Sequence, residues 1–287
     1  MRKIFCTFVL SSLIVGASFD SPLGSFAAEL LAQDRQEKPQ EPFVPRSGQA
    51  GKDVVWVPSP PEMVNKMMEI AKVTPADYVI DLGSGDGRNV IAAAKLGARA
   101  LGVEYNPDMV ALSQKIAKEA GVADKAQFVE GDMYAADISK ATVMALFLLP
   151  VNLNKLAPKF LELTPGSRIV ANTFGIDGWE PDFRTSLPQG SECESWCDVL
   201  LWIVPAKVHG EWTLSNGRLN LTQEYQTVQG TLTLSGTENT VAKGRMNGEE
   251  ISFVAGGQTY TGRVKGSRIE GTVTTANGTQ SWSAMRK

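Results

Sequence analysis

Two carboxylates and a run of glycines are the groups in this sequence best placed to do chemistry. The run Gly83-Ser84-Gly85-Asp86-Gly87 directly follows the apolar segment 78–82, which contains Asp81 two residues before the first glycine. Glycine permits a tight turn and lets a ligand approach the main chain with no Cβ in the way. The spacing G-x-G-x-G differs from the G-x-G-x-x-G of dinucleotide-binding turns. A second apolar segment, 99–103, is followed directly by Glu104, so the pattern indicates a ligand site between two strand ends.

This combination resembles motif I of class I S-adenosyl-L-methionine (SAM) methyltransferases. The resemblance implies that Glu104 accepts hydrogen bonds from the ribose hydroxyls, whereas the alternative is an ordinary solvated loop acid. Gly83, Ser84 and Gly85 would pass the backbone close to the methionine part of SAM. Asp81 would bind the ammonium group of SAM, directly or through water, or would brace the turn.

Further cofactor contacts are expected after the predicted strands 99–103 and 126–130. Gly131-Asp132-Met133 follows the predicted strand 126–130 and resembles the motif whose acid accepts from the adenine amino group. A loop-capping role for Asp132 is the alternative. Asn106 lies two residues beyond Glu104 and could contact the ribose or adenine, or simply begin the helix that Pro107 opens.

Five segments in order resemble a narrower group, the family of protein-lysine methyltransferases that includes the enzymes acting on the ATP synthase c-subunit and the adenine nucleotide translocase. These segments are Val57–Pro60, Asp81–Arg88, Phe147–Pro150, Leu163–Val170 and Trp179–Asp182. The resemblance covers about residues 54 to 205 and implies methyl transfer to an amine. Some relatives have a His-Asp pair where this chain has Asn172-Thr173. Pro150-Val151 also departs from the Pro-Pro-aromatic signature of amino-methylating DNA enzymes, which disfavours nucleobase chemistry.

The elements that must position these residues alternate between strand and helix. Predicted helices cover 60–73, 89–95, 107–119 and 152–163, and predicted strands cover 78–82, 99–103, 126–130, 142–148, 168–173 and 199–204. Such alternation favours a parallel, doubly wound sheet whose ligand lies beyond the carboxyl ends of the strands. We therefore predict an α/β fold, a Rossmann-like seven-stranded methyltransferase domain over residues 54–206.

Residues 207–287 form a separate small antiparallel β domain in this interpretation. Short alternating segments are separated by the turn signals Asn216-Gly217, Asn247-Gly248 and Asn277-Gly278. The pattern predicts a β-meander, either a sandwich or a partly closed barrel, and leaves open whether segment 211–215 completes the methyltransferase sheet. No catalytic cluster is visible in it, so a structural or partner-binding module is expected.

The N-terminus has the features of an export signal. Arg2 and Lys3 precede the apolar stretch 4–19, and a small-x-small site precedes Ala28. We predict a signal peptide over residues 1–27 and a disordered linker over residues 28–53, which is rich in Gln, Glu, Lys and Pro. Export to the periplasm or an equivalent compartment follows. The alternative is an uncleaved anchor that keeps the protein near a membrane.

Charge and metal-ligand counts exclude other classes. The net charge of −3 and pI near 5.4 argue against a nucleic-acid partner, which usually requires a basic domain. Outside the N-terminal stretch only Cys193 and Cys197 remain, and their spacing could close a disulfide loop. With His209 as the one histidine, neither a metal site nor a histidine base is expected.

The sequence therefore favours a SAM-dependent methyltransferase that acts on a protein lysine or another amine. A small-molecule acceptor and an exported, non-catalytic ligand-binding or scaffold protein are the rival interpretations, the latter because SAM is a cytosolic metabolite. No catalytic base is assigned. Tyr134, Asn152, Asp177 and Trp179 are candidates for the rim of the site by position only.

Overall fold

The computed structural model of the protein describes residues 43–188, 190–191, 193–276 and 278–287. The predicted signal peptide and residues 28–42 of the predicted linker lie outside this range. The rest of that linker is not disordered: β1 (Gln49–Ala50) pairs antiparallel with β2 (Val55–Trp56). Among the described residues, no helix has the length and apolar character needed to cross a membrane.

A seven-stranded mixed sheet forms the first domain, with the order β5-β4-β3-β6-β7-β9-β8. Its strands are β3 (Tyr78–Leu82), β4 (Arg99–Glu104), β5 (Ala126–Glu130), β6 (Val143–Leu146), β7 (Arg168–Asn172), β8 (Phe183–Ser186) and β9 (Asp198–Ile203). The strands from β5 to β7 are parallel, whereas β9 runs antiparallel to both β7 and β8. The predicted fold class is confirmed. The seventh strand is β8, which the sequence did not indicate.

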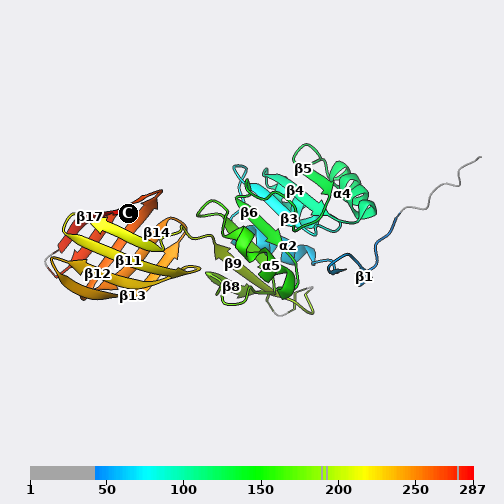
Figure 1. Cartoon of the computed structure of the whole chain (residues 1–287). Coiled ribbons are helices and arrows are strands. Elements are labelled where there is room, and N and C mark those ends of the chain that lie inside the picture. The colour runs from blue at the N-terminus through cyan, green and yellow to red at the C-terminus, as the bar shows by residue number, and fades with distance from the viewer. Residues whose placement is uncertain (1–42, 189, 192, 277) are drawn as a thin grey trace, which may run out of the picture. The chain divides into compact units, whose positions relative to one another are not determined.

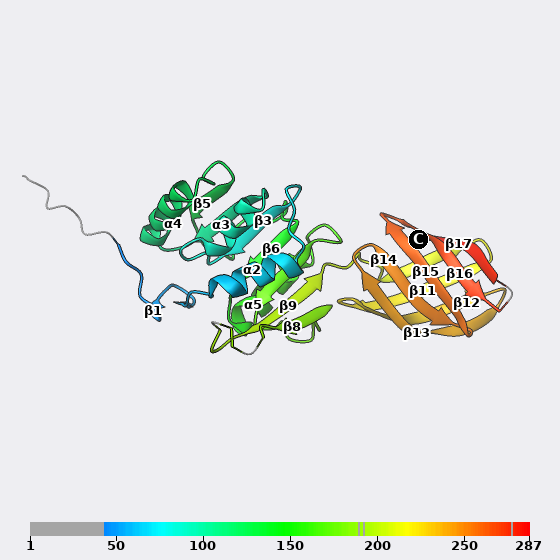
Figure 2. The same ribbon diagram turned by 180° about the vertical axis from the view of Figure 1, so that it is seen from behind.

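Helices cover both faces of this sheet, which is why its central strands are buried and mostly apolar. The helices are α2 (Pro61–Ile70), α3 (Arg88–Lys95), α4 (Pro107–Glu119) and α5 (Pro150–Phe160). One core contains Met67 of α2, Val90 of α3 and Val110 of α4, and the other contains Leu156 and Phe160 of α5. Figure 1 shows α5 in front of the sheet, and Figure 2 shows α2 and α3 on the opposite face.

The chain changes direction across the sheet at β3. It runs outward through β4 and β5 on one side of β3, then returns to β6 and β7 on the other side. In doubly wound sheets a ligand binds in the crevice that this reversal opens at the carboxyl ends of the strands. The glycine turn after β3 lies at that crevice.

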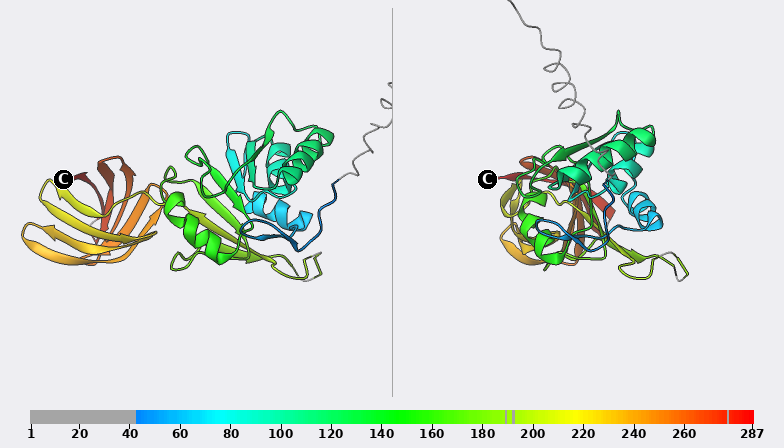
Figure 3. Two further views of the ribbon diagram at one scale, coloured as in Figure 1. Left: turned by 45° about the vertical axis from the view of Figure 1, so that its right-hand side comes forward. Right: turned by 90° about the vertical axis from the view of Figure 1, so that its right-hand side faces the viewer.

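The second domain is a closed eight-stranded barrel, which settles the alternatives of sandwich and barrel. Its strands are β10 (Gly210–Leu214), β11 (Gly217–Glu224), β12 (Thr227–Leu234), β13 (Thr237–Asn247), β14 (Glu250–Ala255), β15 (Gln258–Lys265), β16 (Arg268–Thr275) and β17 (Gly278–Arg286). Each strand pairs with the next, and β17 pairs with β10, so segment 211–215 belongs to the barrel (Figure 3). Large side chains such as Trp212, Phe253 and Tyr260 fill the interior.

Contacts link the barrel to the segment between β7 and β8. The ring of Tyr225 stacks on Trp179 with centroids 5.0 Å apart. Gln226 Nε2 donates to the Glu180 carbonyl at 2.6 Å, and Arg245 pairs with Asp182 at 2.6 Å. The barrel therefore contacts the connection between β7 and β8, a part of the chain that carries none of the predicted cofactor residues.

Asp77 ties together the amino ends of three neighbouring strands. Its carboxylate accepts hydrogen bonds from Thr142 Oγ1 at 2.7 Å, from Thr74 N at 2.8 Å and from the Arg168 guanidinium. Burial alone would raise the pKa of Asp77, but these hydrogen bonds and the Arg168 charge outweigh burial and hold the pKa below its usual value. Because Asp77 precedes β3, Thr142 precedes β6 and Arg168 opens β7, the ionised carboxylate aligns these strands.

We expect Asp77→Asn to lower the free energy of unfolding at pH 7 by roughly 1.5–3 kcal/mol, the usual contribution of hydrogen bonds to a charged group. A lowered pKa means that the stabilisation is present above the pKa of an unfolded aspartate, about 3.9, and is lost as the pH falls through the folded-state value. Urea unfolding at several pH values should show the two proteins converge only below about pH 4. The exposed Asp124→Asn variant is the control, and a pH-independent difference would contradict this account.

Candidate active site

The glycine turn after β3 has a backbone that only glycine adopts easily. Gly83, Gly85 and Gly87 have φ values of +72°, +55° and +81°, in the left-handed region that side chains disfavour. Space around the Cβ position is also restricted at Gly85. A Cβ on Gly85 would lie 2.5 Å from Nε1 of Trp56, whose indole covers the turn. The turn therefore requires glycine both for its backbone and for close approach by a neighbouring group.

Glu104 joins this turn to the end of β4. Its Oε2 accepts a hydrogen bond from Gly85 N at 2.9 Å, and its Oε1 accepts one from Asn106 N at 3.0 Å. The side chain is half-buried and lines the cavity. Each carboxylate oxygen has a second lone pair for a further donor. The geometry thus leaves Glu104 able to accept hydroxyl groups while it holds the turn.

Asp81 is a buried carboxylate that forms no ion pair with any of the described residues. It is 3% exposed, and Asn89 Nδ2 donates to it at 3.1 Å. Burial raises the pKa of Asp81 well above its usual value, the Asn89 hydrogen bond opposes this, and the charges of Glu104 and Asp86 add to it. A cation placed beside Asp81 would relieve this unfavourable electrostatic environment.

The remaining predicted cofactor residues meet the same cavity in different ways. Asp132 accepts from Tyr134 N at 2.8 Å and forms an ion pair with Lys52 at 2.6 Å. Asn106 uses its side-chain oxygen to cap α4, by accepting from Asp108 N at 2.9 Å. The oxygen therefore has the helix-entry role, which leaves its amide nitrogen for a ligand.

One cavity at the carboxyl ends of the parallel strands gathers all eight predicted cofactor residues. They are Asp81, Gly83, Ser84, Gly85, Glu104, Asn106, Asp132 and Met133. Their shared location agrees with a common ligand, although binding itself stays a prediction. Ser84 is 4% exposed and its hydroxyl has no hydrogen-bond partner among the described residues, as is also true of the Asn89 side-chain oxygen.

Sequence reasoning did not indicate that the segment before α2 covers this cavity. Residues 49–59, which include β1 and β2, line it along one side. Lys52 of this segment pairs with Asp132, and Arg88 donates to the Ser59 carbonyl while it pairs with Asp86. No periodic pattern marks residues 49–56, so the Trp56 and Lys52 contacts could be found only from the structure.

The rim candidates named from position are wrong, because none of the four lines the cavity. The Tyr134 hydroxyl accepts from Asn152 Nδ2 at 2.7 Å, and Asp177 accepts from Asn154 Nδ2 at 2.6 Å. Trp179 is 1% exposed and belongs to the core beneath α5. The rim instead carries aromatic side chains, namely Phe147, Phe174 and Trp196.

Metal and histidine chemistry have no visible support in this cavity. The described part of the chain holds no cluster of three or more His, Cys, Asp or Glu side chains arranged for a metal ion. His209 lies exposed between β9 and β10. The cavity therefore offers carboxylates, backbone groups and apolar surface.

These groups fit SAM. The buried Asp81 carboxylate suits its ammonium group, the free lone pairs of Glu104 suit a ribose diol, and the glycine turn allows close approach. Asp81, Asp86 and Glu104 together make the site acidic, which favours a ligand that carries a sulfonium and an ammonium group. The unsatisfied Ser84 hydroxyl is a further group that a ligand could satisfy.

Comparison with known proteins gives one matching family and several relatives. The model described as the ANTKMT methyltransferase domain matches residues 81–183. A protein-lysine N-methyltransferase of Saccharolobus islandicus is 45% identical over 132 residues, which are 45% of this chain and 81% of that protein. A mouse lysine N-methyltransferase of the ATP synthase c-subunit is 40% identical over 108 residues, 37% of this chain and 44% of its own length.

A mouse adenine nucleotide translocase lysine N-methyltransferase is 33% identical over 130 residues, 45% of this chain and 56% of that protein. The chain therefore spans about half the length of the two mouse relatives. Among solved structures, an RNA methyltransferase from Salinibacter ruber in complex with S-adenosyl-L-homocysteine is 45% identical. It covers 53% of this chain and 96% of its own, with a TM-score of 0.49.

We expect Glu104→Gln to weaken SAM binding by at least about tenfold, equivalent to about 1.4 kcal/mol. The substitution removes the charge that strengthens hydrogen bonds from ribose hydroxyls, while it keeps the size of the side chain. Titration calorimetry on the purified protein measures the change. Glu130→Gln, at the matching end of β5 and outside the cavity, is the control. Equal affinities of the wild type and Glu104→Gln would remove Glu104 from the cofactor site.

Gly85→Val should abolish detectable SAM binding in a protein that still folds. The new side chain would meet Trp56 and oppose the positive φ of the turn. Gly121→Val is a matched control, since Gly121 has a φ of +70° but open space around its Cβ position. Circular dichroism should show both variants folded, with SAM affinity lost only at Gly85. Unchanged affinity in folded Gly85→Val would mean that the turn does not approach the cofactor.

Proposed function

We propose that this chain, which belongs to the family of protein-lysine methyltransferases, transfers methyl groups from SAM to the ε-amine of a lysine in a protein acceptor outside the cytosol. Family membership rests on the Saccharolobus islandicus relative, which is 45% identical and of whose length this chain covers 81%. It makes the chain a SAM-dependent N-methyltransferase. The acceptor and the compartment are the proposed parts.

The cavity at the β3 and β4 ends is the observation that carries this function. It brings a buried acid, a ribose-matching carboxylate and a glycine turn into one place. SAM supplies an electrophilic methyl group on its sulfonium when bound. Asp81 would hold the ammonium group, Glu104 the ribose, and Asp132 or its neighbour Met133 the adenine side of the cavity. The remaining wall is free for an acceptor.

A lysine acceptor must lose its proton before its nitrogen can attack a methyl group. A free lysine has a pKa of about 10.4, so its neutral form at pH 7 lies roughly 4.6 kcal/mol uphill. Burial of the amine in an apolar rim lowers its pKa, and a neighbouring cation lowers it further. Phe147, Phe174 and Trp196 provide such a rim. Much of the remaining rate would come from alignment of the reacting groups.

No described side chain of the cavity is a histidine, and we assign no protein base to proton removal. In this mechanism the chain's residues act by position and by exclusion of water. Deprotonation of the acceptor can then precede methyl transfer, with the proton released to solvent. The protein contributes the shape and electrostatics of the site.

An exported location is supported by two features. The N-terminal residues have the pattern of a signal peptide. Cys193 and Cys197 form a disulfide, a bond that persists in oxidising compartments. An exported enzyme needs a supply of SAM outside the cytosol. Cell fractionation and the intact mass of the native protein test the compartment directly.

We expect radiolabel from methyl-labelled SAM to enter lysine side chains of lysate proteins, and this incorporation to vanish when the lysines are acetylated beforehand. If deprotonation of the acceptor limits the rate, kcat/KM should rise by about tenfold per pH unit below the acceptor pKa. Mass spectrometry of the labelled protein identifies the methylated side chain.

The matched controls are the Glu104→Gln variant and total RNA as an alternative acceptor. Label in RNA and none in protein would overturn the lysine assignment, as would transfer to small amines alone. SAM binding without transfer to any of these acceptors would favour the non-catalytic interpretation.

A further inference from the structure

Three aromatic side chains from separate strand ends meet at one side of the cavity. Phe147 follows β6, Phe174 follows β7 by two residues, and Trp196 precedes β9 by two residues. The ring centroids of Phe147 and Phe174 are 6.1 Å apart, and that of Trp196 lies 6.1 Å and 6.5 Å from them. We call these residues the aromatic trio. All three line the cavity that holds the predicted cofactor residues.

The aromatic trio does not fill the core. Phe147 and Phe174 are only partly buried, whereas the neighbours of Phe147, Leu146 and Leu148, are 0% and 1% exposed. Trp196 is 45% exposed. Aromatic side chains that contribute only to stability are normally buried. A set that remains open to a cavity is placed to contact a ligand.

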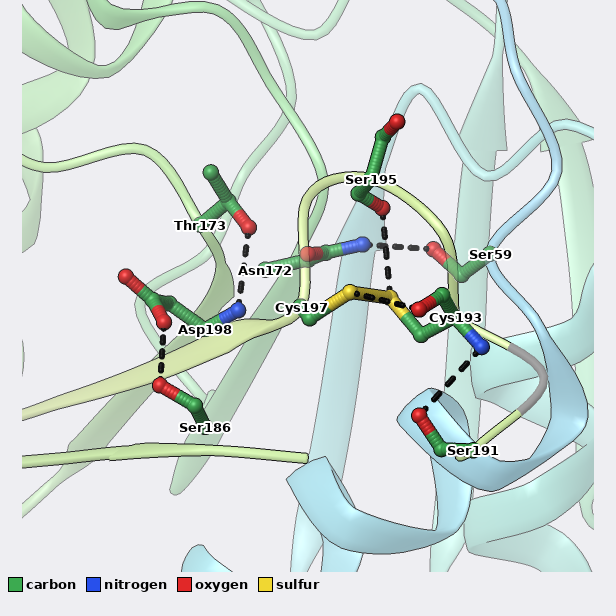
Figure 4. The surroundings of a disulfide bond; sticks show 9 residues. All are labelled: Ser59, Asn172, Thr173, Ser186, Ser191, Cys193, Ser195, Cys197 and Asp198. Carbon is green, nitrogen blue, oxygen red and sulfur yellow. Dashed lines mark hydrogen bonds between the residues drawn. A yellow bond between two sulfur atoms is a disulfide. The ribbon is translucent and has the colours of Figure 1, made fainter. Parts of the chain in front are cut away.

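The backbone near the aromatic trio is strained. Trp196 and Thr173, the residue before Phe174, have φ values of +60°, which a bulky or β-branched residue rarely adopts. Such outliers persist where surrounding contacts impose them, and they gather at functional sites. Thr173 N donates to the Asp198 carbonyl at 2.8 Å, and Asp198 N donates to Thr173 Oγ1 at 3.2 Å (Figure 4). These bonds hold Thr173 against Asp198, which lies two residues after Trp196.

A disulfide fixes the loop that carries Trp196. Cys193 and Cys197 are bonded (Figure 4), and Trp196 lies between them in the sequence. The Cys197 carbonyl accepts from Leu187 N at 2.9 Å, which attaches this end of the loop to the segment after β8. A short closed loop restricts the conformations of its members. The bond therefore keeps the indole against the two phenylalanines despite its exposure.

We infer that the aromatic trio is the acceptor subsite, which holds the methylene stem of the lysine side chain, and that the Cys193–Cys197 disulfide positions Trp196 as its third wall. This inference rests on the proposed function. The apolar faces of the aromatic trio match the four methylene groups of a lysine stem, which packs along apolar surface while its nitrogen extends beyond it. The subsite opens into the cavity that would contain the methyl donor, so a stem held there directs its nitrogen inward.

The experiment compares acceptor and cofactor affinities in the full-length protein. Trp196→Ala should raise the KM for the methylated lysate protein by about tenfold, with kcat changed by less than about twofold. The Kd for SAM should stay the same. Trp196→Phe should restore most of the acceptor affinity, since it keeps an aromatic face. The double variant Cys193→Ser/Cys197→Ser should raise the same KM with all three aromatic residues present.

Phe183→Ala is the matched control, because Phe183 is an exposed aromatic residue of β8 outside the cavity. It should leave both affinities unchanged. Equal weakening of SAM and acceptor binding by Trp196→Ala, or an unchanged acceptor KM, would overturn the subsite.

A binding measurement separates this inference from the proposed function. NMR titration with Nα-acetyl-L-lysine N-methylamide, in the presence of S-adenosyl-L-homocysteine, needs no methyl transfer. Binding that weakens in Trp196→Ala and not in Phe183→Ala supports the subsite even if no protein acceptor is methylated. Transfer to lysine with no effect of Trp196→Ala on either measurement would retain the function and reject the subsite.

Discussion

The carboxylate of Glu104 connects the ends of β3 and β4, and the cavity depends on this connection. It accepts backbone hydrogen bonds from the glycine turn on one side and from the start of α4 on the other. The turn can approach β4 this closely because Gly85 has a positive φ and no side chain. One side chain thus shapes the cavity and faces into it. Any change at Glu104 acts on cofactor contacts and on loop geometry together.

The acidic residues around this connection explain why the site suits a cationic ligand. Asp81 is buried close to Glu104 and Asp86, and among the described residues the ion pair of Arg88 is with Asp86. An arrangement that raises the pKa of a carboxyl group is unfavourable for the empty fold and becomes favourable when a cation binds. Perturbed carboxylates of this kind gather at functional sites for the same reason. The network around Asp77, at the opposite ends of the strands, is fully paired and serves stability.

The cofactor half of the site could be predicted from the sequence, and the acceptor half could not. Asp81, Glu104 and Asp132 each follow a recognisable apolar strand, and the carboxyl ends of parallel strands meet at one edge. Trp196 has no such signal, because its place depends on a disulfide and on strained backbone in a loop. β8 (Phe183–Ser186) was missed for a related reason, since it is a short, exposed edge strand with no apolar alternation.

Predictions made from position along the chain were wrong where tertiary contacts decide which way a side chain points. Trp179 was expected at the rim, but it turns into the core and stacks on Tyr225 of the barrel. Residues 49–53 were expected to be disordered because they are polar, yet Lys52 reaches Asp132 across the cavity. Amino-acid composition describes the average behaviour of a segment and cannot predict a single long-range ion pair.

The closure of the barrel has a consequence for how that domain assembles. Neighbouring strands such as β11 and β12 share eight residue pairs across a short turn, whereas β10 and β17 share three pairs between distant parts of the chain. Local hairpins form at low entropic cost, and joining distant segments costs more. The β10–β17 seam should therefore close last and open first. Two contacts reinforce that seam: the Arg286 guanidinium lies over the Trp212 ring, and Lys287 forms an ion pair with Glu211. The end of the chain therefore holds the barrel closed.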